Sequence, residues 1–194
     1  MLDLTFLLFS LPILLVVITV HEFAHAFVAD RLGDPTPRLA GRLTLNPIAH
    51  LDPIGLLMLV IVRFGWAKPV PINPYNFRDP RQGSLLVSLA GPASNFLFAW
   101  VLAIIMRSLP FPATGLLAYL LSYAIWINLA LAVFNLIPVP PLDGSHVLEY
   151  FLPPYQLESY YRLQQYGFLL LVAIIFFGSP LLIAIVEFLY RLLV

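Results

Sequence analysis

The sequence contains no cysteine, and only 10% of its 194 residues are charged. Without cysteine the chain can form neither a disulfide nor a thiolate metal site, so histidine and the carboxylates are its strong metal ligands. Ten lysines and arginines balance ten acidic residues, which leaves a net charge of zero. No positive field is therefore available to attract a nucleic acid, and we expect no such partner.

The shortage of charge accompanies an excess of apolar residues, which make up 61% of the chain. Ordinary globular domains hold about 45–50% apolar and about 25% charged residues. A soluble fold of this length could not bury so much apolar surface, so the composition predicts an integral membrane protein. No lysine or arginine precedes Arg31. Because a secretory signal begins with basic residues, we expect the first apolar run to be a retained membrane helix.

The apolar runs predict an all-α polytopic membrane protein with about four to six transmembrane helices in a single domain, residues 1–194. A spanning helix needs about 20 apolar residues, and four segments meet this requirement: 2–29, 83–109, 115–137 and 166–193. The last segment can tilt, or break at Gly178-Ser179-Pro180. The run 53–62 is too short to cross a membrane. The sequence therefore predicts that residues 36–62 form a re-entrant or interfacial segment. Weak alternation over 36–45 favours a β-hairpin-like strand pair there.

The distribution of positive charge indicates an orientation. Seven of the ten lysines and arginines lie within residues 31–81. The positive-inside rule places this stretch in the cytosol, which puts the N-terminus outside and returns residues 138–165 to the cytosol. Four spans would leave the C-terminus outside, and a break in the last span would reverse that side.

One motif carries clear chemistry: His21-Glu22-Phe23-Ala24-His25 follows the pattern H-E-x-x-H. On a helix, residues four apart share a face, so both imidazoles can reach one metal ion. Glu22 is close enough to deprotonate a metal-bound water, whose pKa zinc lowers to about 7. The alternative is that these groups are solvated at the end of the helix, about 26 Å from Leu4. That alternative does not explain their order and spacing.

Zinc usually takes three protein ligands, and two histidines leave one missing. Asp143 is the best candidate, because it follows three prolines at the cytosolic end of the third span, on the same membrane face as His21. The alternative role for Asp143 is to cap a short helix that begins near Ser145. His146 is the second candidate ligand. His50, in a loop, is interpreted as a hydrogen-bonding residue that holds the loop.

Together these motifs resemble the site-2 protease family of intramembrane zinc metalloproteases. The resemblance covers about residues 16–150. The chain shows no PDZ-type domain of the kind that many members insert, so it resembles the minimal bacterial or archaeal branch. Its elements occur in order: His21–His25, the run Leu45–Gly55 (LNPIAHLDPIG), the run Gly65–Pro74 (GWAKPVPINP), the G-x-x-x-N element Gly91–Asn95, and Asn135…Pro138…Pro141-Leu142-Asp143-Gly144.

The resemblance implies a zinc-dependent intramembrane endopeptidase that cleaves a transmembrane segment of another protein near the cytosolic side, in regulated intramembrane proteolysis. It implies one Zn²⁺ per chain, bound by His21, His25 and Asp143, and a water activated by Glu22. Asn135 would bind substrate or stabilise the oxyanion. Residues 36–62 would help present the substrate as an extended strand.

The resemblance also leaves some roles open. Gly91 and Asn95 either contact the substrate or permit close packing of helices. The expected partners are a transmembrane substrate and membrane lipid in a prokaryotic cell membrane. The oligomeric state stays open, and a homo-oligomer is one alternative.

Two other functional classes compete with the protease. A catalytically silent binding protein of the same fold is disfavoured, because His21, Glu22, His25 and Asp143 are all present. A transporter that uses these polar groups for ion passage would be expected to show internal pseudo-symmetry between its halves, which this sequence does not show.

Overall fold

The computed structural model describes residues 6–62, 65–109 and 114–194. Within these residues, four helices are long and apolar enough to cross a membrane, at Leu8–Arg31, Pro80–Ser108, Gly115–Asn135 and Gly167–Leu193. The all-α polytopic fold predicted from composition is confirmed. The expected start of the first span at residue 2 lies outside the described residues.

The helices follow one another with short connections. Their order is η1 (Phe6–Ser10), α1 (Leu11–Arg31), α2 (Thr36–Leu39), α3 (Pro47–His50), α4 (Pro53–Val62), η2 (Pro74–Asn76), α5 (Pro80–Ser108), α6 (Gly115–Asn135), α7 (Asp143–Phe151), α8 (Pro154–Gln164), α9 (Gly167–Ala173), η3 (Ile174–Gly178) and α10 (Ser179–Leu193).

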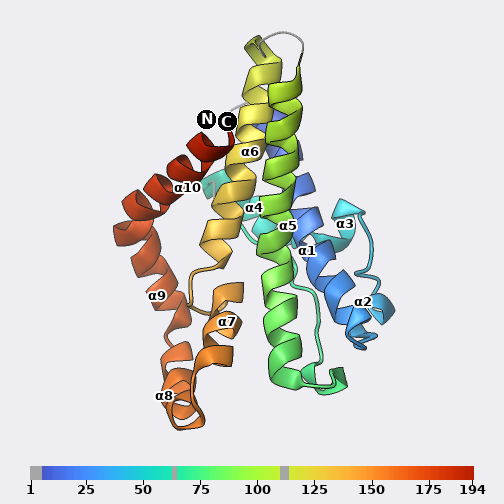
Figure 1. Cartoon of the computed structure of the whole chain (residues 1–194), viewed down its shortest axis with the longest axis vertical. Helices are drawn as coiled ribbons and strands as arrows, with labels where there is room; N and C mark the ends of the chain where they lie inside the picture. The colour runs from blue at the N-terminus through green and yellow to red at the C-terminus, as the bar shows by residue number, and fades with distance from the viewer. Residues whose placement is uncertain (1–5, 63–64, 110–113) are drawn as a thin grey trace.

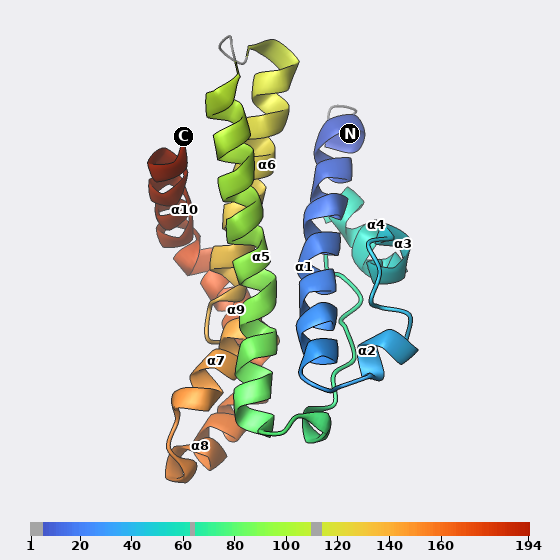
Figure 2. The same ribbon diagram turned by 45° about the vertical axis from the view of Figure 1, so that its right-hand side comes forward.

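Helix α5 is the centre of the bundle and packs against α1, α6 and α7 (Figures 1 and 2). Helix α10 covers the far side of α6, where the buried side chains of Ile125, Leu129 and Val186 form the main apolar cluster with Ala99 and Ala103. Helix α5 therefore contacts both the helix that carries His21 and the helix that carries Asp143. This central position decides how the site is assembled.

The last span is helical throughout but bends at η3, where α9 and α10 meet at an angle (Figure 1). Pro180 lies two residues after the end of η3. Its ring removes an N–H donor and collides with the carbonyl four residues earlier, so the chain widens into a π-helical turn just before it. The sequence GSP marks the bend correctly, and helical structure continues on both sides of it.

The segment after α1 differs from the expected strand pair. Residues 36–39 form helix α2, and the following residues are turns rather than strands, so the β-hairpin-like interpretation of 36–45 is wrong. Pro35 and Pro37, at the start of α2, explain this, because proline favours the start of a helix and cannot donate to a ladder. The sole β-bridge among the described residues joins Leu51 and Ala67.

Two buried charged side chains hold these short elements together. The carboxylate of Asp34 accepts hydrogen bonds from the backbone and hydroxyl of Thr36, from the backbone of Asn73 and from the side chain of Asn76. The guanidinium of Arg42 donates to the carbonyls of Ala49, Lys68 and Pro69. Each group thereby ties the residues after α1 to the loop before α5.

Candidate metal centre

The metal-ligating side chains predicted from the sequence meet at one point. His21 and His25 lie on the same face of α1, and the N-terminus of α7 brings Asp143 against them. The Nε2 atoms of the two histidines are 3.0 Å apart. Oδ2 of Asp143 lies 3.3 Å from Nε2 of His21 and 3.4 Å from Nε2 of His25. Three candidate ligand atoms therefore form a nearly equilateral triangle.

The dimensions of this triangle fit zinc. Ligands at about 2.0–2.1 Å from a tetrahedral zinc lie about 3.3 Å from one another, and two imidazoles with one carboxylate are typical of catalytic zinc sites. Oδ2 of Asp143 is buried and has no hydrogen-bond partner. A buried acceptor without a partner is costly, and a cation in the triangle would satisfy it.

The protonation of His25 agrees with this interpretation. Its Nδ1 atom lies 2.7 Å from the carbonyl oxygen of Val87, on α5. Because a carbonyl can only accept, Nδ1 carries the proton, and Nε2 of the neutral ring presents a lone pair to the triangle. Nδ1 of His21 lies 2.6 Å from Oδ1 of Asn95, also on α5. Such outer hydrogen bonds orient metal-binding histidines and increase their basicity.

Two glycines allow these helices to approach closely. A Cβ atom at Gly91 would overlap the rings of both His21 and His25, and a Cβ at Gly144 would overlap the carbonyls of Leu136 and Ile137. Gly91 therefore lets α5 lie directly against the histidines. Gly144 lets α7 begin immediately beside the end of α6, which directs Asp143 toward α1.

The other predicted residues divide into two groups. Glu22 and Asn135 line the same cavity of about 490 Å³ as the three candidate ligands. Asn95 is fully buried and does not line it; its hydrogen bond to His21 makes it a support for the metal centre, and a contact with substrate remains an untested prediction. His146 also lines the cavity, but its Nδ1 lies 3.4 Å from Oε2 of Glu149, and the residue does not belong to the triangle.

The loop residues also have assignable positions. Nε2 of His50 lies 2.8 Å from the carbonyl oxygen of Thr44, which fits the loop-holding role expected for it. None of the described residues of 36–62 lines the site cavity. The extended stretch that follows lines it instead, with Trp66, Ala67 and Val70 among its residues. The sequence motif around Trp66 was recognised, but its proximity to the metal centre depends on the fold.

Sequence reasoning missed Asn128 and Arg81. Asn128, on α6, is fully buried and hydrogen-bonds Asn95. An amide inside an apolar span is a signal that could have identified it, since polar groups in membrane helices usually have a function. Arg81, at the start of α5, donates to the carbonyls of Glu149, Tyr150 and Leu152 at the end of α7. Nothing in the local sequence predicts that contact.

Comparison with known proteins identifies related chains. Residues 110–177 match Peptidase family M50. The "Putative zinc metalloprotease YwhC" of Bacillus subtilis is 43% identical over 178 residues, which cover 87% of this chain and 79% of YwhC. The "Putative zinc metalloprotease Rip2" of Mycolicibacterium smegmatis is 35% identical over 80% of this chain and 61% of Rip2. The zinc metalloprotease MJ0392 of Methanocaldococcus jannaschii is 28% identical over 70% of this chain and 32% of MJ0392. No solved structure gives a significant match.

Proposed function

The chain belongs to peptidase family M50, the zinc metalloproteases related to site-2 protease, and from this membership we propose that it cleaves a transmembrane segment of another protein. Its four apolar spans make it an integral membrane protein. As a metalloprotease it uses zinc, and membership favours an enzyme over the silent binding protein and the transporter.

The observation that carries the assignment of ligands is the triangle of His21, His25 and Asp143. Its edges of 3.0, 3.3 and 3.4 Å match the separation expected for three ligands of one zinc. Among the residues that the structure describes, no lysine or arginine lines the cavity to neutralise the Asp143 carboxylate. When bound, zinc polarises the scissile carbonyl and acidifies water.

Two side chains beside the triangle are assigned to the reaction. The Glu22 carboxylate takes a proton from the attacking water and then delivers it to the leaving amide nitrogen, as a general base followed by a general acid. Glu22 lines the cavity next to His21 on α1, and Asn135 lines it from the end of α6. The Asn135 side chain hydrogen-bonds the carbonyl of Leu131, which holds it at that end. An amide donor there would stabilise negative charge on the substrate oxygen.

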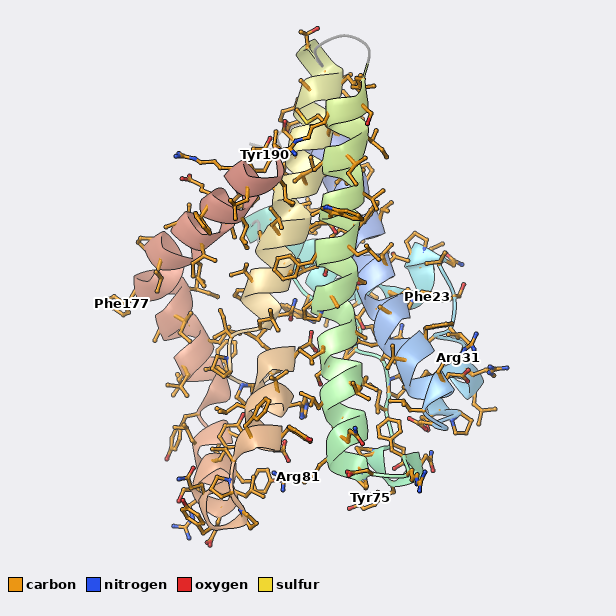
Figure 3. All side chains as sticks on the ribbon, in the orientation of Figure 1. Phe23, Arg31, Tyr75, Arg81, Phe177 and Tyr190 are labelled. Atoms are coloured by element: carbon orange, nitrogen blue, oxygen red, sulfur yellow. The ribbon has the colours of Figure 1, made fainter. Side chains whose placement is uncertain are left out.

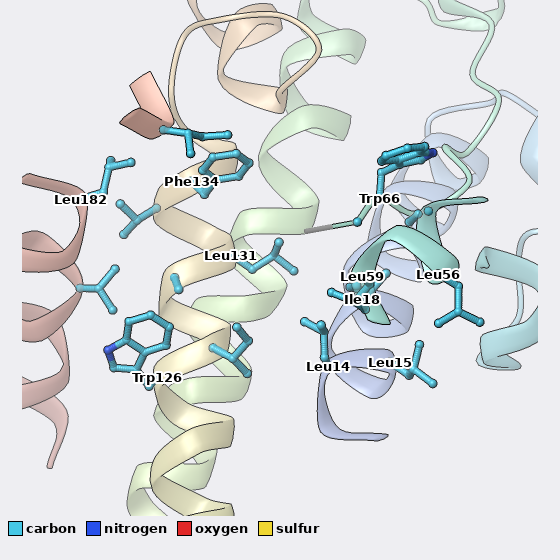
Figure 4. Close-up of a pocket in the computed structure, with 18 of the residues that line it drawn as sticks. Leu14, Leu15, Ile18, Leu56, Leu59, Trp66, Trp126, Leu131, Phe134 and Leu182 are labelled. Carbon is cyan, nitrogen blue, oxygen red and sulfur yellow. The ribbon is translucent and has the colours of Figure 1, made fainter. Parts of the chain in front are cut away.

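A second cavity supports a substrate that arrives from the membrane. It has a volume of about 360 Å³ and lies between α1 and α4 on one side and α6 and α10 on the other (Figure 4). Apolar side chains such as Leu14, Leu59 and Trp126 line it. It shares Ile18, Gly65, Trp66, Ala67, Leu131 and Phe134 with the metal-site cavity. An apolar segment held there could reach the metal centre without crossing bulk water.

The position of charge supports cleavage near the cytosolic side. Arg31 and Arg81 lie in the half of the bundle that carries α7 and α8 (Figures 1 and 3). By the positive-inside rule this half faces the cytosol. His25 is six residues before the end of α1, about 9 Å along the helix, so water from that end has a short path to the site.

Metal analysis and cleavage in proteoliposomes test this function. The substrates are single-span reporter proteins whose transmembrane segments contain a helix-breaking Asn-Gly or Gly-Pro pair. We expect one zinc per wild-type chain, loss of zinc in His21→Ala, and retained zinc with at least about a 100-fold loss of cleavage in Glu22→Gln.

Each variant tests a separate part of the proposal. Full zinc occupancy in His21→Ala would show that the ligand set is wrong. Undiminished cleavage by Glu22→Gln would show that another group moves the proton. His146→Ala is the matched control, since His146 lies at the same cavity but faces Glu149, and it should keep both zinc and activity.

A further inference from the structure

A chain of buried amides crosses three helices and ends at a proposed metal ligand. Nδ2 of Asn128, on α6, donates to the carbonyl of Ala124 at 2.7 Å. Oδ1 of Asn128 lies 3.0 Å from Nδ2 of Asn95, on α5. Oδ1 of Asn95 then lies 2.6 Å from Nδ1 of His21, on α1. Both asparagines are 0% exposed, and neither lines the site cavity.

The direction of this chain is determined at its far end. The carbonyl of Ala124 can only accept, so Asn128 must turn its amide nitrogen toward it and its oxygen toward α5. That oxygen can only accept in turn, so Asn95 must present its nitrogen to Asn128 and its oxygen to His21. Nδ1 of His21 is therefore the protonated nitrogen, and Nε2 is left with a lone pair for the metal.

Asn95 by itself does not enforce this state. If its amide were reversed, its nitrogen would donate to Nδ1 of His21, and the ring proton would move to Nε2, where it would block metal binding. The other acceptor near the Asn95 nitrogen, the carbonyl of Val17, lies at 3.5 Å, beyond the usual range. His25 needs no such relay, because the carbonyl of Val87 contacts its Nδ1 directly.

We propose that Asn128 is a positioning residue of the metal centre, which selects the metal-binding tautomer of His21 through Asn95. The proposal rests on the proposed ligand set of His21, His25 and Asp143. It assigns to α6 a role in zinc affinity, although the side chain of Asn95 lies between Asn128 and His21.

The test uses the full chain in detergent, with zinc alone as the ligand and a competing chelator to measure affinity. Asn128→Leu keeps the approximate size and removes the acceptor, so the orientation of Asn95 is no longer enforced. Loss of an outer-shell partner typically weakens metal binding by about 10- to 100-fold, and we expect a loss of at least about tenfold. Thr19→Val is the matched control, because it removes a buried hydrogen bond from the same helix as His21 outside the relay.

A spectroscopic readout separates tautomer selection from general loosening. In metal-free protein with ¹⁵N-labelled imidazoles, His21 of the wild type should carry its proton on Nδ1. Asn128→Leu should give a substantial Nε2-protonated fraction at His21 and leave His25 unchanged. If the wild-type His21 is already protonated mainly on Nε2, the proposal is wrong whether or not the variant folds.

A double mutant gives an independent check. In Asn95→Asp, both carboxylate oxygens accept, so His21 must donate from Nδ1 without help from Asn128. In that background Asn128→Leu should weaken zinc binding by no more than about twofold. An equal loss in both backgrounds would overturn the relay. If His21→Ala keeps its zinc, the ligand set fails; if it loses zinc but Asn128→Leu does not, only the relay fails.

Discussion

Replacing Gly91 by alanine should break the metal centre while leaving the helix intact. The added Cβ would stand 2.5 Å from Cε1 and 2.7 Å from Nε2 of His21, and would overlap Nε2 of His25 as well. Unbonded carbon atoms prefer about 3.5–4.0 Å, so the rings or α5 must move by about 1 Å. Metal–ligand distances tolerate about 0.2 Å. The triangle therefore cannot keep its dimensions.

We expect Gly91→Ala to lower zinc affinity by at least about tenfold and cleavage of a single-span reporter, measured as kcat/KM, by about 100-fold. Alanine is favoured over glycine inside a helix by about 1 kcal/mol, so the loss cannot come from helix propensity. Gly178→Ala is the matched control, because a Cβ there meets its nearest neighbour, Cγ2 of Ile174, at an ordinary 3.4 Å. If both variants bind zinc equally well, the close approach of α5 to the histidines is not required and this reasoning is refuted.

Three further predictions concern the supports of the site. Asp143→Ala should reduce bound zinc well below one per chain by metal analysis, and full occupancy would mean that the third ligand lies elsewhere. Burial acts to raise the pKa of the Asp34 carboxyl, but hydrogen bonds led by that from Thr36 outweigh it and hold the pKa below its ordinary value. Its stabilising effect is therefore present above the ordinary carboxyl pKa of about 3.9 and is lost as the pH falls through the lower, folded-state pKa. Asp34→Asn should therefore make unfolding less dependent on acid below about pH 4 and should lower the free energy of unfolding at pH 7 by about 2 kcal/mol. Arg81→Met should weaken zinc binding less than about tenfold, since its contacts to the end of α7 are exposed; an unchanged chelator titration would show that α7 is held without it.

Several features of the fold could be predicted because they depend on local sequence alone. Apolar runs of membrane-spanning length identified the four spans, and the spacing of His21 and His25 placed both on one helix face. The expected strand pair over residues 36–45 was wrong for an equally local reason, since the weak alternation there was outweighed by Pro35 and Pro37, which start a helix. The sequence left two roles open for Asn95, substrate contact or close packing of helices, and it carries no information about the buried hydrogen bond from this residue to His21.

The sequence by itself determined the chemical class of this protein: an apolar chain without cysteine, with two imidazoles and a carboxylate at metal-binding spacing and one further carboxylate in a proline-rich turn. The tertiary structure decided which groups touch. Asn95 reaches His21 across 74 residues, and Asn128 reaches Asn95 across 33. These contacts arise because Gly91 lets α5 lie against α1 while its other face packs on α6. Contacts between distant segments depend on how the helices pack, and the periodicity of one helix does not encode its neighbours.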